Sequence, residues 1–225
     1  MITRYGYDVY FTIATVCVII IIIALVFIEP KSYRYSLIFV SLLVFGFTTN
    51  FFRDPDRSTP KGESLIVAPA DGKVILIKQV DENEYFHSKA WIVSIFMSPF
   101  NVHVNRNPIS GQISYTRYVE GEYFAAYEDK ASEKNEQMIV GLEGKFGKVM
   151  FKQIAGFIAR RIVCPLKQGD SVIVGERFGM IKFGSRVDIY LPISVNICVK
   201  VGDMTKAGET ILANFAQNKL EKMKQ

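Results

Sequence analysis

Histidine and cysteine are scarce in this chain, and their scarcity argues against several kinds of site. The 225 residues contain two histidines, His87 and His103, and three cysteines, none of them in a CxxC pair. Two distant histidines nearly exclude the centre of a zinc peptidase, and the cysteine spacing argues against a structural zinc site or a disulfide framework. A G-x-S-x-G elbow, a P-loop and a dinucleotide fingerprint are also absent from the sequence. We therefore expect no metal, and the odd, unpaired cysteines favour a reducing compartment.

Charge of one sign is not concentrated anywhere in the chain. The formal net charge is +5, without a dense Arg/Lys stripe in the part that follows the apolar N-terminus. This pattern argues against nucleic acid as a partner. A modest basic excess suits an anionic lipid surface, although an ordinary basic protein with solvated lysines has the same net charge.

Two long uncharged runs lie near the N-terminus. The first, Tyr10 to Ile28, has 19 residues, and a helix of this length spans roughly 29 Å, the thickness of a bilayer core. The second, Ser36 to Phe52, has 17 residues and ends in polar ones. The linker Glu29 to Tyr35 is short and contains a proline. We predict a transmembrane hairpin with both ends on one side; the alternative is a single span followed by a buried apolar segment.

Basic residues near the two runs favour cytoplasmic termini. Arg4, Arg53, Arg57 and Lys61 flank the outer ends of the hairpin, and Lys31 and Arg34 lie in the linker. The excess at the outer ends points to the cytoplasm. We therefore predict that residues 1–52 anchor the chain in the cell (inner) membrane and that residues 53–225 form a folded domain at its cytoplasmic face.

The remainder of the chain is expected to be mainly β. Short apolar and β-branched runs, punctuated by Gly, Pro, Asp or Asn, are typical of a sandwich or barrel. The expected strands are Leu65 to Ala68, Lys73 to Val80, Trp91 to Met97, Gln112 to Tyr118, Lys148 to Ile154, Ile162 to Cys164, Phe178 to Phe183, Val187 to Leu191 and Val195 to Val201. Two segments have helical character, Tyr123 to Lys134 and the tail from Thr210 to Gln225.

An internal repeat narrows the fold class. Lys167 to Glu176 and Lys200 to Glu209 both read K-x-G-D-x-x-x-x-G-E, 33 residues apart. Gly-Asp supplies a turn that tolerates positive φ, and the second glycine turns the chain back into a strand. Such units are similar to those of lipoyl-type modules. We therefore predict a barrel-sandwich (lipoyl-like) β-domain with few short helices.

One strand-like run is unusually rich in polar side chains. His103 stands there with Asn101, Asn105 and Arg106. A lone histidine in a strand is more often a packed or surface residue, but this density of hydrogen-bonding groups favours a pocket wall. Arg106 suits a phosphate or carboxylate.

Two further residues lie in segments that look like turns. Asp71, in Val67-Ala-Pro-Ala-Asp-Gly-Lys-Val74, is typical of a turn between Pro and Gly. The pair Gly184-Ser185 stands between two strand-like runs, and such a pair by itself only marks a turn.

Taken together, these segments resemble the short-form phosphatidylserine decarboxylases of bacteria and archaea. The resemblance covers nearly the whole chain, and its most specific parts are the Gly-Ser pair and the run from Asn101 to Asn105. The matching segments, in order, are Phe51-Phe-Arg-Asp-Pro-Asp-Arg57, Ala68-Pro-Ala-Asp-Gly-Lys73, Ser98-Pro-Phe-Asn-Val-His-Val-Asn-Arg106, Gly121-Glu-Tyr-Phe124, Asn135-Glu-Gln137 and Phe183-Gly-Ser185.

The resemblance implies a carboxy-lyase that makes its own cofactor. In this family the proenzyme cleaves itself before the serine of the Gly-Ser pair. Here the products would be a β chain, Met1 to Gly184, and an α chain, Ser185 to Gln225, in which the serine becomes a pyruvoyl group. That group would form a Schiff base with phosphatidylserine and yield phosphatidylethanolamine after loss of CO₂. His103 is the candidate acid that protonates the product.

One departure from the family concerns the self-cleavage step. Longer members carry a second histidine where this chain has Arg106, and they use it in an Asp-His-Ser triad. Asp71 and Ser185 match the outer members of that triad. Either His103 serves both steps or another group activates Ser185, and we favour His103. We expect Asn101, Asn105 and Arg106 to bind the substrate.

Two alternatives remain open from the sequence. The chain could be a membrane-anchored lipoyl-like adaptor without catalysis, in which Gly184-Ser185 is a plain turn. It could also act on a related phosphoserine lipid such as archaetidylserine. The expected partners are the phospholipid, the membrane and the two chains of the same proenzyme, and a homodimer is possible.

Overall fold

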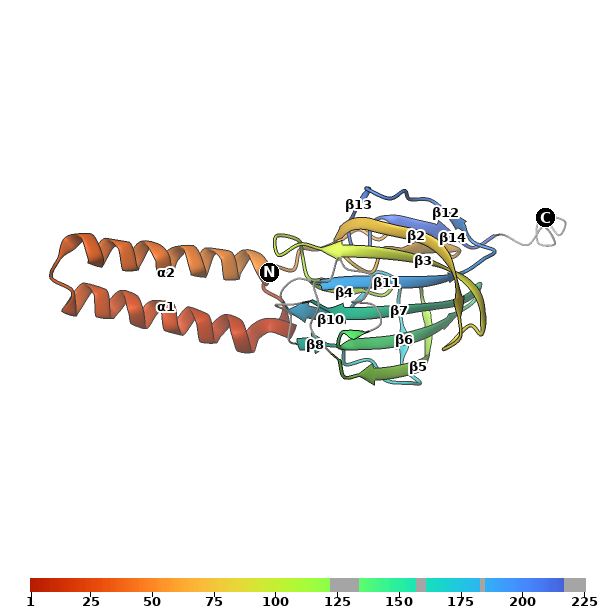
Figure 1. Ribbon diagram of the computed structural model, residues 1–225, viewed down its shortest axis with the longest axis horizontal. Coiled ribbons are helices and arrows are strands. Elements are labelled where there is room, and N and C mark those ends of the chain that lie inside the picture. The colour runs from red at the N-terminus through yellow and green to blue at the C-terminus, as the bar shows by residue number, and fades with distance from the viewer. Residues whose placement is uncertain (122–133, 157–160, 183–184, 217–225) are drawn as a thin grey trace. The chain divides into compact units, whose positions relative to one another are not determined.

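The computed structural model describes residues 1–121, 134–156, 161–182 and 185–216 of the chain. These residues belong to two compact units, Met1–Pro55 and Asp56–Gln225. The first unit is helical and the second is built from strands (Figure 1).

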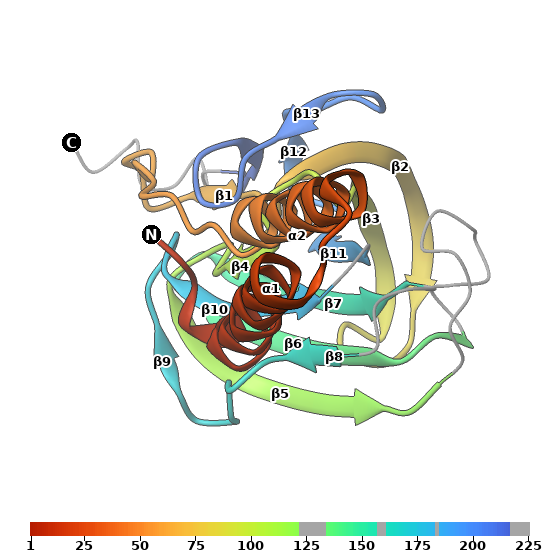
Figure 2. The same ribbon diagram turned by 90° about the vertical axis from the view of Figure 1, so that its left-hand side faces the viewer.

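The first unit is a helical hairpin. A short 3₁₀ turn, η1 (Arg4–Gly6), leads into α1 (Tyr7–Phe27), and α2 (Lys31–Phe51) returns beside it (Figures 1 and 2). Both helices are long and apolar enough to cross a membrane, by length and composition alone. The two apolar N-terminal helices are therefore confirmed as helices.

The connection between the helices is shorter than the sequence predicts. Because α2 begins at Lys31, the predicted linker Glu29–Tyr35 is wrong in its extent. Pro30 fits the start of α2, where its missing N–H has no helical partner to lose. Arg34 Nε donates a hydrogen bond of 2.8 Å to the carbonyl oxygen of Ile28. This arginine therefore caps the end of α1 from within the first turn of α2.

The second unit is mainly β, as the sequence predicts. Its large sheet has 8 strands in the order β13-β2-β3-β11-β7-β6-β5-β9, and two 3-stranded sheets have the orders β1-β14-β12 and β4-β10-β8. Figure 2 shows the large sheet curling into a half-barrel. The strands are β1 (Leu65–Val67), β2 (Gly72–Glu82), β3 (Ser88–Met97), β4 (Val104–Arg106), β5 (Gly111–Val119), β6 (Gln137–Gly144), β7 (Gly147–Ala155), β8 (Arg161–Val163), β9 (Ser171–Val172), β10 (Arg177–Lys182), β11 (Ser185–Pro192), β12 (Asn196–Ile197), β13 (Met204–Thr205) and β14 (Ile211–Asn214).

The main core lies on the inner face of the large sheet. Side chains alternate along a strand, so Val187, Ile189 and Leu191 of β11 point into this core. The residues between them point to the outer face, where Tyr190 joins a smaller apolar cluster. The lipoyl-like barrel-sandwich label is more specific than this architecture and stays a prediction.

The two copies of the repeat form matching turns. The backbone N–H groups of Lys167 and Lys200 donate to Asp170 Oδ2 and Asp203 Oδ2, each at 2.8 Å. The glycine before each aspartate has a positive φ, +95° and +102°, a region that favours glycine. The first turn leads into β9, which pairs with β5, and the second into β13, which pairs with β2. The repeat therefore closes the large sheet at both of its edges.

Two predicted elements need correction at the C-terminal end. The tail predicted to be helical from Thr210 instead forms β14, which pairs with β1 and β12. Short apolar runs fit either state, and the partner strands lie elsewhere in the sequence. The predicted strand Val195–Val201 contains only the short β12. The rest of the tail beyond residue 216, and the predicted helix from Tyr123 up to residue 133, lie outside the described residues.

Candidate functional site

Ser185 is the first residue of β11, near the middle of the large sheet. It pairs with Met97 of β3 on one side and Ala155 of β7 on the other. It is 0% exposed, and its Oγ donates a hydrogen bond to Met97 Sδ at 3.3 Å. Its predicted cleavage partner, Gly184, lies outside the described residues. The serine hydroxyl therefore points toward the inner face, away from solvent.

Two buried amides lie beside this serine. Asn105 and Gln153 are both 0% exposed. Asn105 Nδ2 donates to the carbonyl oxygen of Pro69 at 3.3 Å and lies 3.9 Å from Met97 Sδ. Gln153 Nε2 donates to Asn105 Oδ1 at 2.8 Å. The structure thus brings Ser185 and the predicted residue Asn105 together around one sulfur atom.

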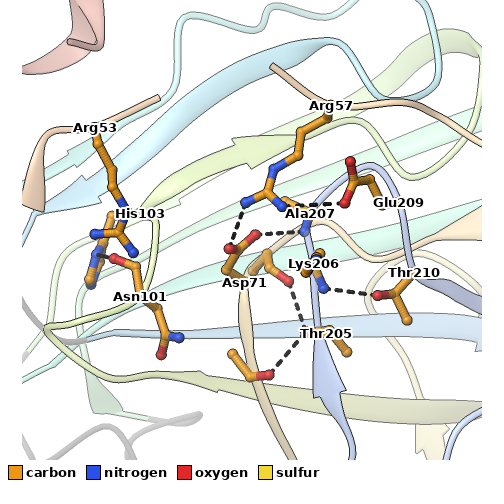
Figure 3. A network of polar contacts seen from close by, with 12 residues as sticks. Arg53, Arg57, Asp71, Asn101, His103, Thr205, Lys206, Ala207, Glu209 and Thr210 are labelled. Atoms are coloured by element: carbon orange, nitrogen blue, oxygen red, sulfur yellow. Dashed lines mark hydrogen bonds and ion pairs between the residues drawn. The ribbon is translucent and has the colours of Figure 1, made fainter. Parts of the chain in front are cut away.

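His103 lies directly before β4 and is fully buried. Its Nδ1 is 3.0 Å from the carbonyl oxygen of Asn101 (Figure 3). A carbonyl oxygen only accepts, so Nδ1 carries the proton and Nε2 carries the lone pair. The Asn101 side chain accepts a hydrogen bond from the Ser98 amide at 2.9 Å and so fixes the turn that supplies this carbonyl.

Strand pairing places β4, which begins directly after His103, beside β10. Val104 of β4 pairs with Met180 of β10 in antiparallel register. One further step in that register sets His103 beside Ile181. Ser185 follows Ile181 by four residues. The histidine therefore lies beside the segment that leads to the predicted cleavage bond.

Asp71 belongs to an ionic network with the second repeat (Figure 3). Its Oδ2 accepts a hydrogen bond from Arg57 Nη2 and its Oδ1 one from the Ala207 amide, each at 2.7 Å. Arg57 Nη1 lies 3.4 Å from Glu209 Oε2. The Ser58 amide, helped by the Arg57 charge, lowers the pKa of Glu209 below its ordinary value. Arg57 thus joins two carboxylates.

The predicted site residues are held by different partners. Asp71 is anchored to Arg57 and Ala207, whereas His103 is anchored to Asn101. An Asp-His-Ser triad through these residues stays a prediction.

Arg106 is anchored to the first repeat. It is buried, and its Nη1 donates to the carbonyl oxygen of Gly175 at 2.9 Å. This bond ties β4 to the turn of the first repeat. The expected roles of Asn101, Asn105 and Arg106 in substrate binding stay predictions.

Sequence reasoning gave no role to two residues near Ser185. Gln153 stands in a row of inward positions of β7 with Val149, Phe151 and Ala155. A polar residue among the otherwise apolar inward positions of a strand is the sequence signal that could have identified Gln153. Asn135 was named only as part of a matching segment. Its Nδ2 donates to the Ala155 carbonyl oxygen at 2.7 Å and so fixes the end of β7 beside Ser185.

A cavity of about 510 Å³ lies at the other end of β7. It includes the turn Gly144–Phe146, whose last residue is nine residues before Ala155, or roughly 30 Å along a strand. Its lining is Thr59, Pro60, Lys61, Gly62, Glu63, Leu65, Ile109, Ser110, Gly144, Lys145, Phe146, Val174 and Phe215. None of the site residues above lines it. Within the described residues, no cluster of His, Cys, Asp or Glu could hold a metal ion.

Comparison with known proteins gives a consistent result. Residues 44–213 match the family model described as phosphatidylserine decarboxylase. The chain is 45% identical over 215 residues to the phosphatidylserine decarboxylase proenzyme of Chlorobium limicola, covering 96% of this chain and 100% of that protein. It is 44% identical over 215 residues to the proenzyme of the same name from Prosthecochloris aestuarii, covering 96% and 98%. With that from Chlorobaculum tepidum it shares 47% over 199 residues, covering 88% and 91%.

Proposed function

The chain belongs to the phosphatidylserine decarboxylase family, and on this premise we propose that it decarboxylates phosphatidylserine to phosphatidylethanolamine with a pyruvoyl group made from Ser185. The observation that carries the proposal is the setting of Ser185. Its hydroxyl is buried at the start of a central strand and shares the Met97 sulfur with Asn105. The strand β4, which follows His103, pairs with β10, the strand that precedes Ser185 in the chain.

Maturation begins with the serine hydroxyl. Ser185 Oγ adds to the carbonyl carbon of Gly184 and gives its proton to a base, the C–N bond breaks, and the peptide becomes an ester. Loss of the Ser185 α-proton and departure of the Gly184 carboxylate leave dehydroalanine. One water molecule converts this residue into the pyruvoyl group and releases ammonia. The products are the β chain, Met1 to Gly184, and the α chain, Ser185 to Gln225.

His103 is the proposed base for maturation and the proposed acid for decarboxylation. With the proton on Nδ1 held by the Asn101 carbonyl, Nε2 is the nitrogen able to accept the Ser185 proton. The same nitrogen, once protonated, can return a proton to the substrate carbon. Asp71, fixed by Arg57 and the Ala207 amide, is proposed to supply the negative charge that stabilises the protonated imidazole.

The surroundings of Ser185 suit a reactive carbonyl. Neither Met97 nor Ala155, its neighbours across the sheet, carries a group that attacks a ketone. Ser185, Met97 and Ala155 are all buried, which limits the access of bulk water to this position. Gln153 Oε1 is buried and has no hydrogen-bond partner among the described residues. The pyruvoyl group, when formed, supplies a carbonyl for the substrate amine and accepts the electrons that CO₂ leaves behind.

The helical hairpin is proposed to anchor the enzyme to its substrate. Helices α1 and α2 would hold residues 53–225 at the cytoplasmic face of the cell membrane, where the diacyl substrate lies. A homodimer is compatible with this arrangement and is also a proposal.

The experiment is a decarboxylation assay with a matched serine control. Purified wild type should release CO₂ from phosphatidylserine labelled at the serine carboxyl, in detergent micelles. Ser185→Ala should release none, whereas Ser88→Ala, at an exposed serine of β3, should match wild type. Release by Ser185→Ala at the wild-type rate would overturn the assignment. Archaetidylserine in the same assay tests whether this related phosphoserine lipid is also a substrate.

A further inference from the structure

Gln153 lies within reach of residue 185 although no step above uses it. It pairs with Val187 across β7 and β11, so both residues share the inner face with Ser185. Gln153 and Ser185 are therefore diagonal neighbours in an antiparallel pair, with Cα atoms about 7–8 Å apart, a distance that long side chains span. The Gln153 side chain is also fully buried.

A backbone carbonyl fixes the direction in which this amide points. The Pro69 carbonyl oxygen only accepts, so Asn105 must turn its NH₂ group toward Pro69. Asn105 Oδ1 then faces Gln153, which must present its own NH₂ group in return. The remaining polar atom of Gln153 is consequently Oε1, an acceptor without a partner among the described residues. A buried acceptor left unpaired costs free energy, and a donor that binds beside it recovers that cost.

We propose that Gln153 Oε1 accepts a hydrogen bond from the amine of the lipid headgroup. The inference rests on the proposed function, because the amine must approach residue 185 to react there. A primary ammonium has N–H donors to offer, and a hydrogen bond to a charged donor is stronger than one between neutral groups. Gln153 thereby selects headgroups that carry an amine and orients the nitrogen toward residue 185.

The test compares two product-like ligands that differ at one position. Dioctanoyl phosphatidylethanolamine and dioctanoyl phosphatidylpropanol differ in an ammonium against a methyl group, and each is titrated as an inhibitor of decarboxylation. Wild type should favour the amine ligand by more than about tenfold, and Gln153→Met should lower this preference by about tenfold, the size expected for one charge-assisted hydrogen bond. Formation of the α chain, followed by mass, should stay within about twofold of wild type in this variant.

The control is Phe151→Leu, on the same strand and the same inner face but one row further from Ser185. It should lower the unfolding temperature and leave the amine preference unchanged, since it removes packing and no polar atom. Gln153→Leu, also apolar and of similar volume, provides a second variant for the same comparison.

The results distinguish failure of the proposed function from failure of this inference. A wild type without an α chain would overturn the proposed function and this inference with it. An α chain together with an unchanged preference in Gln153→Met would overturn the inference alone, and Oε1 would then be paired with a buried water only. A wild-type preference below tenfold, or loss of the α chain in Gln153→Met, would also overturn it, the latter by assigning Gln153 to maturation.

Discussion

Arg186 and Asp188 form an ion pair on the outer face of β11, immediately after the serine that we propose as the cleavage site. Arg186 Nε lies 2.6 Å from Asp188 Oδ1, and the two side chains are 2% and 0% exposed. Arg186 Nη2 also donates to Ser94 Oγ in β3 at 2.8 Å. A slip of β11 by one residue would turn both charges into the apolar core and Ser185 outward. The pair therefore favours the register that points Ser185 inward.

Breaking this pair and replacing it are expected to have different effects. Arg186→Met leaves a buried carboxylate and should cost about 3–5 kcal/mol of unfolding free energy, whereas Arg186→Met with Asp188→Leu should recover most of that loss. If the charges also set the register, the double variant forms its α chain at least about tenfold more slowly than wild type. Urea unfolding followed by fluorescence of Trp91, the single tryptophan, measures the first effect, and mass the second. Wild-type cleavage in the double variant would contradict the role in register.

The two histidines of the chain provide a matched pair for the proposed base. His103→Asn should slow both α-chain formation and decarboxylation by about 10²–10⁴-fold, the usual contribution of a general acid or base. His87→Asn, at an exposed turn with φ of +52°, should have little effect because Asn tolerates that region. The time course of α-chain appearance checks maturation separately from turnover. Normal maturation in His103→Asn would mean that another group activates Ser185.

Asp71 and Arg57 allow charge and ion pairing to be separated. Asp71→Asn and Arg57→Gln both remove the 2.7 Å ion pair and so should both lower stability, Arg57→Gln by more because Arg57 also contacts Glu209. Only Asp71→Asn removes the negative charge proposed for maturation, so only this variant should form its α chain at least about tenfold more slowly. Equal maturation in the two variants would make Asp71 a structural residue of the second repeat.

The cysteines of the second unit should differ in reactivity with pH. Burial raises the pKa of Cys164 from 9.0 to about 11, so its thiolate is scarce at pH 8 and its labelling rate should rise about tenfold per pH unit toward pH 11. Cys198 is exposed and should react readily at pH 8. Rates are measured with a thiol reagent in Cys17→Ser variants that keep one of these two cysteines. Equal rates at pH 8 would contradict the raised pKa of Cys164, which is half-buried.

Features set by local sequence were predictable. The K-x-G-D turns depend on one glycine and one aspartate close together in the chain, and both copies form as expected. The apolar runs of α1 and β3 likewise predict their own structure, within a few residues at the ends. Single motifs named Ser185, His103 and Asn105, and the structure places Asn105 beside Ser185.

Features that depend on distant partners were not predictable. Gln153 bonds Asn105 across 48 residues, and the Asp71 carboxylate meets the Ala207 amide across 136. Strand pairing decides both contacts, and neither segment carries a local mark of its partner. The same reason explains the tail, where β14 is a strand because β1 and β12 offer it backbone partners.

The most direct test of the central claim is the intact mass of the purified chains. Two chains are predicted, Met1 to Gly184 and Ser185 to Gln225. The smaller chain should be lighter than its unmodified peptide by one ammonia, blocked to Edman degradation and sensitive to borohydride. One stable chain of 225 residues from a preparation that decarboxylates phosphatidylserine would contradict the claim that Ser185 supplies the reactive carbonyl.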